Sequence, residues 1–571
     1  MSDNDNRLNQ DRQMIQAAQK KGLGATFATF TKLSGPGWLQ SAITLGGGSL
    51  ASSLYLGVLA GYGMLWLQPF AMILGIIMLS CIAFVTLSTG QRPFQAIRDH
   101  INPVLAWAWA IATLMANMVW SLPQFALANG VIQQNLAPEL LGGDTGKWIN
   151  CFFILVVTVA ITWCYGNGSR GIQIYETILK LMVAMIVLSF VGVVFKMAFS
   201  EQGLPIGQII GGFIPDLSRM NTPAAGFVPL LEAIPEGARA FWSDLIITKQ
   251  RDVMISAAAT AVGINMTFLM GYSLLAKGWD RDFRGLTIFD LSTGMFIPFV
   301  LATSCVVIAA SNQFHLKPAP GFLGETNDAG ALIAPSGKAT KDFNGLVSSR
   351  IKSTLTAAEK ETATDAAALT ALVQAKKDAG EISDAETRLA ATLVNRDVRE
   401  LALSLEPLTG KGFANLIFGV GVLGMALSTI TILMLISGFV ICEMFGLPRS
   451  GWPFKLGCLA ACTGVLGPFL WGQAAAYLAV PTSVFGMVLL PIAYISFFLL
   501  MNQKSLLKEH LPTGMARVVW NVLLFFAASV ATAASLFVIN QKVGTYGWIG
   551  VGVLLALAII SHFTRKKPAA S

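Results

Sequence analysis

Charged residues are scarce in this sequence. Asp, Glu, Lys and Arg make up 12% of its 571 residues, whereas soluble domains carry about 25%. Its seven cysteines form no C-x-x-C pair, which argues against a zinc site or a disulfide framework. The four histidines, His100, His315, His510 and His562, fall in loops or near the ends of apolar runs. With no P-loop and no nucleophile–base set, we expect neither an enzyme nor a cofactor.

Long apolar runs are what the sequence has instead. Hydrophobic residues make up 54% of the chain, and runs of 18 or more can cross about 30 Å of hydrocarbon. The polar start, "MSDNDNRLNQDRQMIQAAQKKG", predicts no cleavable signal peptide. We therefore predict an all-α polytopic membrane protein. The predicted spans are 37–61, 64–88, 102–132, 148–166, 174–198, 225–247, 253–277, 412–444, 455–472, 479–501, 516–540 and 545–563.

Positive charge orients these spans. The formal net charge is +8, but the basic residues lie mostly in short loops and at the ends, as in cytoplasmic loops, so nucleic-acid binding is not expected. The basic residues used are Lys20, Lys21, Lys32, Arg92, Arg98, Arg170, Lys249, Arg251, Lys504, Lys508, Arg517, Arg565, Lys566 and Lys567. They place both termini in the cytoplasm if 291–311 is a re-entrant or packed segment. We predict twelve spans in the cell membrane, which is the inner membrane in a Gram-negative bacterium.

A charged, alanine-rich stretch separates the two sets of spans. Capping-box spacings at Thr356/Glu359 and Ser383/Glu386 predict a helical hairpin outside the membrane. By the span count it is extracytoplasmic, and a structural insert is favoured over a partner-binding arm. The predicted organisation is a tail at 1–35, a transporter core at 36–313, the insert at 314–405, the second part of the core at 406–563 and a tail at 564–571.

Two spans carry residues that interrupt helices. Gly46, Gly47, Gly48 and Ser49 fall within the first span, and each glycine costs a helix interior up to about 1 kcal/mol relative to alanine. Pro235 and Gly237 interrupt the sixth. Irregular backbone at membrane depth is tolerated where it lines a cavity, and inverted-repeat transporters bind substrate at such a matched pair. We predict a binding site between the two breaks.

The sequence resembles the Nramp family of divalent-metal transporters. The likeness lies in "SGPGWLQSAITLGGGSLASSLYLGVLAGYGMLWL", "RPFQAIRDHINPVLAWAWAIATLMAN" and "SLEPLTGKGFANLIFGVGVLGMALSTI". It covers most of the membrane part and leaves out the insert. The resemblance implies a LeuT-type fold of the APC superfamily, with two inverted five-helix halves, broken first and sixth helices and alternating access.

The family's site residues are replaced at the matching positions. Its Asp-Pro-Gly-Asn falls on Gly46–Ser49, and its Ala-Met-Pro-His falls on Ala233, Ile234, Pro235 and Glu236. The acidic pair of its third span falls on Ser121 and Gln124. These ten positions form the predicted substrate site, in which the family's methionine is missing.

Two substrate classes fit the residues that remain. Glu232 and Glu236, followed by Asp244, share a helical face, and intramembrane acids are functional by default. With the thioether missing, they favour a hard cation such as Mg²⁺. Pairing with Arg239 is the structural alternative for Glu236. The other class is a small anion, such as bicarbonate or a carboxylate, or an amino acid, held at the exposed N–H groups of the glycine break.

Coupling to protons is predicted to be weak or absent. Ser121 and Gln124 stand where the family has acids, and Glu176 with Lys180 at i+4 is read as a structural pair. The expected partners are a small inorganic ion or small anionic substrate and the lipid bilayer, and the oligomeric state is left open.

Overall fold

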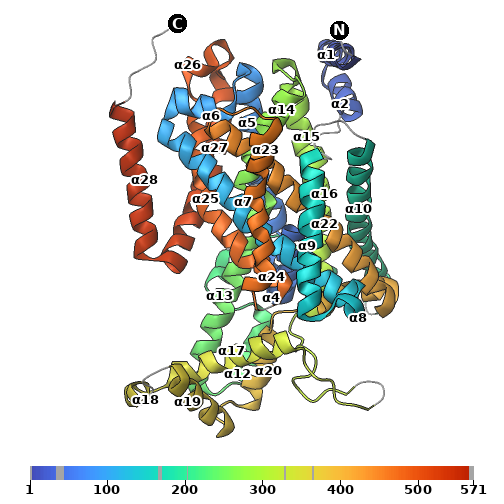
Figure 1. Cartoon of the computed structure of the whole chain (residues 1–571), viewed down its shortest axis with the longest axis vertical. Helices are drawn as coiled ribbons and strands as arrows, with labels where there is room; N and C mark the ends of the chain where they lie inside the picture. Colours follow the sequence, from blue (N-terminus) through green and yellow to red (C-terminus); the bar gives the residue numbers. More distant parts are fainter. Residues whose placement is uncertain are drawn as a thin grey trace.

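Long helices run through nearly all of the computed structural model (Figure 1). It describes residues 3–33, 44–164, 170–201, 203–326, 330–362, 366–472 and 474–564. The Gly35-Pro36-Gly37 opening and the basic residues Arg565, Lys566 and Lys567 lie outside these ranges. Within them the β-structure is one isolated bridge between Thr326 and Leu332. The helical fold predicted from the apolar runs is confirmed.

Apolar helices form the body of the molecule. In lipid a helix satisfies its own backbone hydrogen bonds, so these runs fold as helices. They are α4 (Gly47–Ala60), α5 (Leu67–Thr89), α7 (Pro103–Val131), α9 (Gly143–Cys164), α10 (Arg170–Ala198), α13 (Glu236–Ala261), α14 (Ile264–Ala276), α15 (Arg284–Asp290), α16 (Phe296–Phe314), α22 (Glu406–Met444), α23 (Gly451–Cys458), α24 (Gly467–Leu470), α25 (Ala479–Met501), α27 (Gly514–Val538) and α28 (Thr545–Thr564).

The remaining α-helices lie mainly at the two ends of this bundle (Figure 1). They are α1 (Asp3–Lys21), α2 (Leu23–Leu33), α6 (Pro93–Ala96), α8 (Pro138–Leu141), α11 (Ile206–Gly211), α12 (Val228–Glu232), α17 (Gly337–Thr354), α18 (Ala357–Thr362), α19 (Ala366–Asp378), α20 (Asp384–Leu393), α21 (Val398–Leu401) and α26 (Lys504–Leu507).

Eleven helical segments of the described chain are long and apolar enough to cross a membrane. The shorter α4 joins them in the centre of the bundle, where it packs against α16 and α13. Two assignments of the span prediction are corrected. The predicted spans 225–247 and 253–277 belong to one helix that is broken in the middle, α13 with α14. The stretch 291–311 is neither re-entrant nor a packed fragment, because it belongs to a continuous helical segment over Arg281–Phe314.

The two corrections cancel in the count. One predicted span is lost and one is gained before the insert, so the insert and the termini still fall at opposite ends. In Figure 1 α1 and the last turns of α28 lie at one end of the bundle, and α17 to α20 lie at the other. We call these the terminal end and the insert end.

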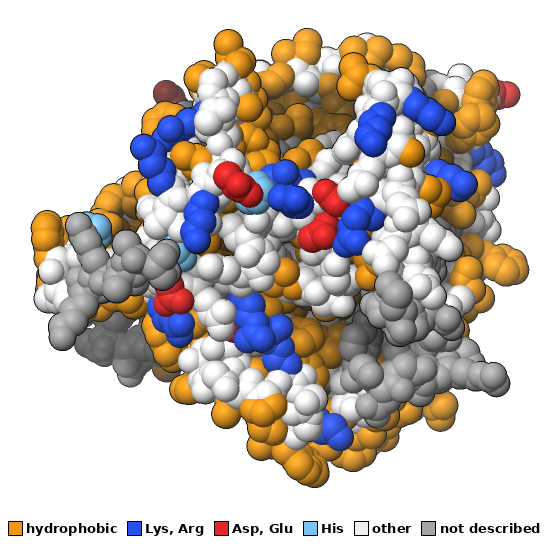
Figure 2. All heavy atoms as spheres, turned by 90° about the horizontal axis from the view of Figure 1, so that it is seen from above, with side chains coloured by type: hydrophobic (Ala, Val, Ile, Leu, Met, Phe, Trp, Pro, Cys, Tyr) orange, Lys and Arg blue, Asp and Glu red, His pale blue; other side chains and the backbone are white. Residues whose placement is uncertain are grey.

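Basic side chains mark the terminal end. Figure 2 looks onto it and shows lysine and arginine side chains spread over the face, with acidic ones in a few places. The N-terminal helix α1 is held there, because Arg12 Nη2 lies 2.9 Å from Asp280 and its Nε lies 3.4 Å from Asp282. Lys249 and Arg251 are a further correction, because they lie within α13 rather than in a loop at this end.

Candidate functional site

The first break lies at the glycine run, as predicted. The helix α4 begins at Gly47, and Gly46 before it has an extended backbone with φ −85° and ψ 178°. The buried Ser49 hydroxyl turns back and donates hydrogen bonds to the carbonyl oxygens of Thr44 and Gly46. The chain before Thr44 lies outside the described residues. Residues 44–49 therefore expose backbone groups at the start of a half-helix.

The second break lies far from Pro235. The helix α13 runs from Glu236 to Ala261, Val262 and Gly263 are extended, and α14 begins at Ile264. Pro235 is the residue that precedes the first turn of α13, where a missing N–H breaks no helical hydrogen bond. The proline thus marks the start of a helix and not its interruption.

Gly263 has a steric reason to be glycine. A Cβ built on it would lie 2.2 Å from Cη2 of Trp120 on α7, a distance that real Cβ atoms do not show. The indole therefore fills the space that a side chain at 263 would occupy. Its Nε1 donates a 3.0 Å hydrogen bond to the Thr482 carbonyl, which holds the ring in place.

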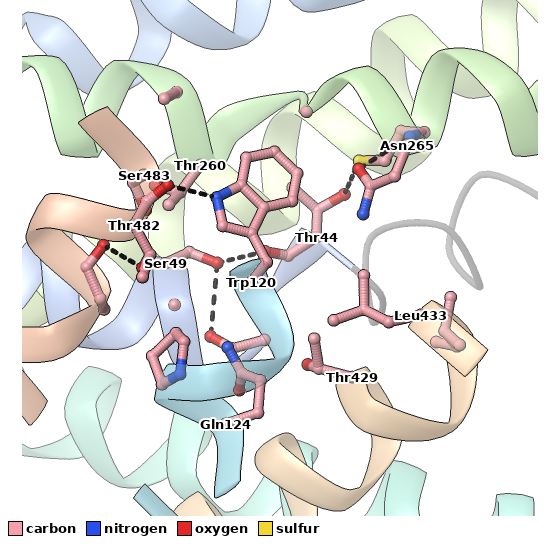
Figure 3. A pocket seen from close by; sticks show the side chains of 18 of the residues that line it. Thr44, Ser49, Trp120, Gln124, Thr260, Asn265, Thr429, Leu433, Thr482 and Ser483 are labelled. Atoms are coloured by element: carbon pink, nitrogen blue, oxygen red, sulfur yellow. Dashed lines mark hydrogen bonds between the residues drawn. The ribbon is translucent and has the colours of Figure 1, made fainter. Parts of the chain in front are cut away.

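A cavity of about 80 Å³ lies between the two breaks. Figure 3 shows Trp120, Ser49 and Gln124 close together within it, with Thr482 and Ser483 on one side and Thr429 and Leu433 on the other. We call it the central cavity. Its lining residues are Thr44, Gly46, Gly48, Ser49, Trp120, Pro123, Gln124, Ala259, Thr260, Gly263, Asn265, Met266, Leu269, Thr429, Ile432, Leu433, Ile436, Ala479, Thr482 and Ser483.

The described lining residues are all uncharged. They offer hydroxyl and amide groups together with the thioether of Met266, whose Sδ lies 3.8 Å from the Thr44 hydroxyl. Gln124 Oε1 is buried without a hydrogen-bond partner among the described residues. Such an orphaned acceptor costs about 1–3 kcal/mol, a cost that is recovered if the Gln124 side chain turns to meet a ligand.

Comparison with known families identifies this architecture. The model of the Natural resistance-associated macrophage protein-like family, Nramp, matches residues 37–358 and 382–539. The chain belongs to the Nramp family. Two crystal structures of the Eremococcus coleocola manganese transporter, a mutant and a complex with an aromatic bis-isothiourea substituted compound, share its fold. Both have a TM-score of 0.57 over 94% of this chain and 95% of that one, at 13% and 14% identity. The LeuT-type fold implied by the resemblance is thereby confirmed.

Named relatives match over shorter stretches. Metal transporter Nramp4 of Arabidopsis thaliana is 25% identical over 201 residues. Natural resistance-associated macrophage protein 1 of Homo sapiens is 24% identical over 204 residues. These matches cover 34% and 35% of this chain and 36% and 34% of the relatives. The chain thus spans about a third of the length of the relatives it matches.

The structure separates the predicted Nramp site into two groups. Gly46, Gly48, Ser49 and Gln124 line the central cavity, and Gly47 lies beside it against Gln124. Ser121 does not line the cavity. Its hydroxyl donates to the Met118 carbonyl at 2.7 Å, and it packs against Gly464.

The predicted residues of the sixth span lie at the insert end. Glu232, Ala233, Pro235 and Glu236 are exposed, as is Asp244, and only Ile234 of this stretch is buried. About 40 Å of α13 separates Glu236 from the break at Val262. The metal-site prediction for Glu232 and Glu236 is therefore corrected: they do not reach the central cavity.

The alternative for Glu236, an ion pair with Arg239, is not what Arg239 forms in the described structure. Its guanidinium donates to the carbonyl oxygens of Leu231, Glu232 and Ile234, at 3.1 to 3.2 Å. It thus satisfies the backbone of the turn between α12 and α13. The Glu176 side chain lies outside the described residues.

Sequence reasoning missed the segment that supplies the second break. Thr260, Gly263, Asn265 and Met266 line the cavity and all lie within the predicted span 253–277, for which the sequence predicts no break. A glycine at the centre of that span, two residues before an asparagine, was the available signal. Because Met266 lines the cavity, the inference that the site has no thioether is also corrected. Within the described chain no three His, Cys, Asp or Glu side chains group as a metal site.

Proposed function

We propose that this Nramp protein is a secondary transporter that moves a divalent cation by alternating access, with the central cavity as its substrate site. One observation carries the proposal. Two broken helices and α7 line one cavity with Thr44, Gln124 and Met266, whose side chains carry oxygen and sulfur atoms, and the Gln124 acceptor has no partner in the described protein. Acceptors of this kind suit a cation or the water bound to it.

The helix ends at the cavity act in opposite directions. α4 and α14 begin there, which favours an anion, but α13 ends there with its last carbonyl groups, which favour a cation. The relatives named as metal transporters support the cation.

A hard cation that keeps much of its water is the substrate we favour. The uncharged lining of the central cavity offers no carboxylate to replace the hydration shell of an ion. Mg²⁺ gives up water reluctantly and is bound through it in many proteins. One thioether without thiolate or imidazole is a weak basis for selecting a transition metal.

Uptake into proteoliposomes tests both site and substrate. We expect Mg²⁺ uptake above Mn²⁺ uptake, and a loss of about tenfold in Gln124→Leu, because one ligand interaction is worth about 1.5 kcal/mol. The matched control is Glu236→Gln, which lies outside the cavity and is expected to retain wild-type uptake. Bicarbonate uptake without cation uptake would replace the proposal with the anion carrier.

The same vesicles test proton coupling. Because no described residue that lines the cavity is Asp, Glu or His, we expect an imposed cation gradient to leave the internal pH unchanged. A pH-sensitive dye inside the vesicles measures this. Acidification or alkalinisation that follows the cation gradient and needs the protein would contradict it.

The basic terminal end supports the proposed orientation in the cell membrane. Lysine and arginine side chains spread over that end, and cytoplasmic surfaces carry such an excess. We place both termini in the cytoplasm and the insert outside.

A further inference from the structure

Three consecutive insert residues are buried where the insert meets the membrane bundle. Asn395, Arg396 and Asp397 follow α20 and are 6%, 2% and 7% exposed. Polar groups this deeply buried are costly unless they are bonded. We call residues 395–397 the junction segment.

Each junction residue binds a different membrane helix or its extension. Lys249 on α13 donates from Nζ to Asn395 Oδ1 at 3.3 Å. Tyr55 on α4 donates from its hydroxyl to the Arg396 carbonyl at 2.6 Å.

Asp397 binds the third partner, Gln134, in the π-helical turn Ile132–Leu136 after α7. The Gln134 amide donates to Asp397 Oδ2 at 2.9 Å. Two helices that line the central cavity, α4 and α13, and the turn that follows a third, α7, are thus joined by one segment of the insert.

The junction segment is itself fixed to the protein. The Arg396 guanidinium donates to the Lys317 carbonyl and lies 5.7 Å from the ring centre of Phe314, at the end of α16. The Asn395 backbone N–H donates to Asp342 of α17 at 2.7 Å. The segment therefore has a firm support against which α4 and α13 are held.

The helices that it holds are the two half-helices of the site. α4 starts at the cavity with Gly47, and Tyr55 lies about 12 Å further along it. α13 ends at the cavity with Ala261, and Lys249 lies about 18 Å before that end. Both half-helices are therefore tied, part-way along their length, to two neighbouring residues of the junction segment.

A second cavity, of about 410 Å³, lies on the insert side of the central one. Ala126, Gln134 and Lys338 of α17 are among the residues that line it. α7 runs along both cavities, with Gln124 in the central one and Ala126 in this one. Ala126 is 2% exposed.

We propose that the junction segment is the gate latch of the insert end: it positions α4 and α13 in the closed arrangement and releases them when the central cavity opens toward the insert. In this proposal the insert takes part in gating, because its junction segment controls the positions of α4 and α13. A role for the latch in transport rests on the proposed function, but the labelling experiment below tests the latch without measuring transport.

Labelling of a reporter cysteine tests the latch in the purified full-length protein. Ala126→Cys places the reporter between the cavities, and maleimide labelling is followed by peptide mass mapping. We expect Tyr55→Phe and Lys249→Met, each added to the reporter, to raise the labelling rate of the new cysteine about fivefold, the effect of one lost hydrogen bond. The matched control is Lys376→Met, which removes ion pairs with Glu359 and Glu381 inside the insert.

The native Cys81, fully buried in α5, reports general loosening in the same samples. The latch predicts that its labelling stays unchanged. Equal labelling of the reporter with and without Tyr55→Phe and Lys249→Met would overturn the latch, and so would a parallel rise at Cys81. A protein that shows the predicted labelling but takes up no cation would retain the latch and lose the proposed function.

Discussion

Gly47→Ala is expected to lower cation uptake about tenfold, as much as the loss of Gln124 itself. A Cβ at residue 47 would lie 2.6 Å from Gln124 Oε1 and 3.1 Å from Leu127 Cδ1. The amide is the far end of a flexible side chain, so it will move and leave the rest of α7 in place. The protein should therefore fold, because alanine favours the helix more than glycine by up to about 1 kcal/mol, while the Gln124 amide is displaced from its place beside the glycine run.

A second glycine provides the matched control for this prediction. Gly237 lies in the first turn of α13, and a Cβ built there meets nothing within 4 Å. Gly237→Ala should retain wild-type uptake in the same proteoliposome assay. Equal losses in the two variants would mean that the break predicted at Pro235 matters as much as the break at Gly47. Wild-type uptake in both variants would show that the glycine run is not part of the substrate site.

The sequence predicts the first break better than the second, because a run of glycines is a more specific signal for an interrupted helix than a single proline or a single glycine. Three successive glycines at mid-span have few readings besides an interrupted helix. Proline has two, since it interrupts a helix interior but is favoured at a helix start, and Pro235 is of the second kind. Gly263 looks like one of the isolated glycines that membrane helices tolerate, and only the Trp120 ring from another helix shows why it is required.

The span count has a similar origin. Hydropathy identifies a run of apolar residues but does not indicate which part of a long helix lies in the membrane. α13 extends beyond the bundle beside the insert (Figure 1), so its 26 residues with the 13 of α14 were divided into two spans. Charge argues against a span at 291–311 when Lys249 and Arg251 are counted as loop residues, whereas both lie within α13. Lys249 is instead buried against Asn395 of the insert. No local sequence pattern predicts this contact, because the two residues are far apart in the chain.

The largest effect on stability is expected at the buried capping box of the insert. Glu386, 1% exposed, accepts hydrogen bonds from Arg350 Nε at 2.8 Å and Trp242 Nε1 at 3.0 Å. Its other oxygen accepts from the backbone N–H of Ser383 at 3.0 Å. Burial raises the pKa of Glu386, but the hydrogen bonds from Trp242 and Ser383 and the charge of Arg350 outweigh it, so the pKa lies below its usual value.

Glu386→Ala is expected to destabilise the docked insert by about 3–5 kcal/mol, because Arg350 is left buried without its partner. Hydrogen exchange of the amides in α17 and α20 measures this loss as faster opening. Since the folded pKa of Glu386 is depressed, its contribution is present above the ordinary carboxyl pKa of about 4.3. It is lost as the pH falls through the lower folded value, so the exchange difference between wild type and variant should shrink in acid.

Glu359 offers a control with the same spacing and a different environment. It accepts from the Thr356 N–H at 2.8 Å and pairs with Lys376 at 2.9 Å, but its side chain is 32% exposed. The hydrogen bond from the Thr356 backbone, with those from Lys376 and the Thr356 hydroxyl, lowers the pKa of Glu359 to about 2. Water screens that site, so the ion pair adds little and Glu359→Ala should cost far less than Glu386→Ala. Equal exchange in the two variants would show that the capping boxes themselves hold the insert. A large difference assigns that role to the buried contacts with Arg350 and with Trp242 of α13, the half-helix that ends at the central cavity.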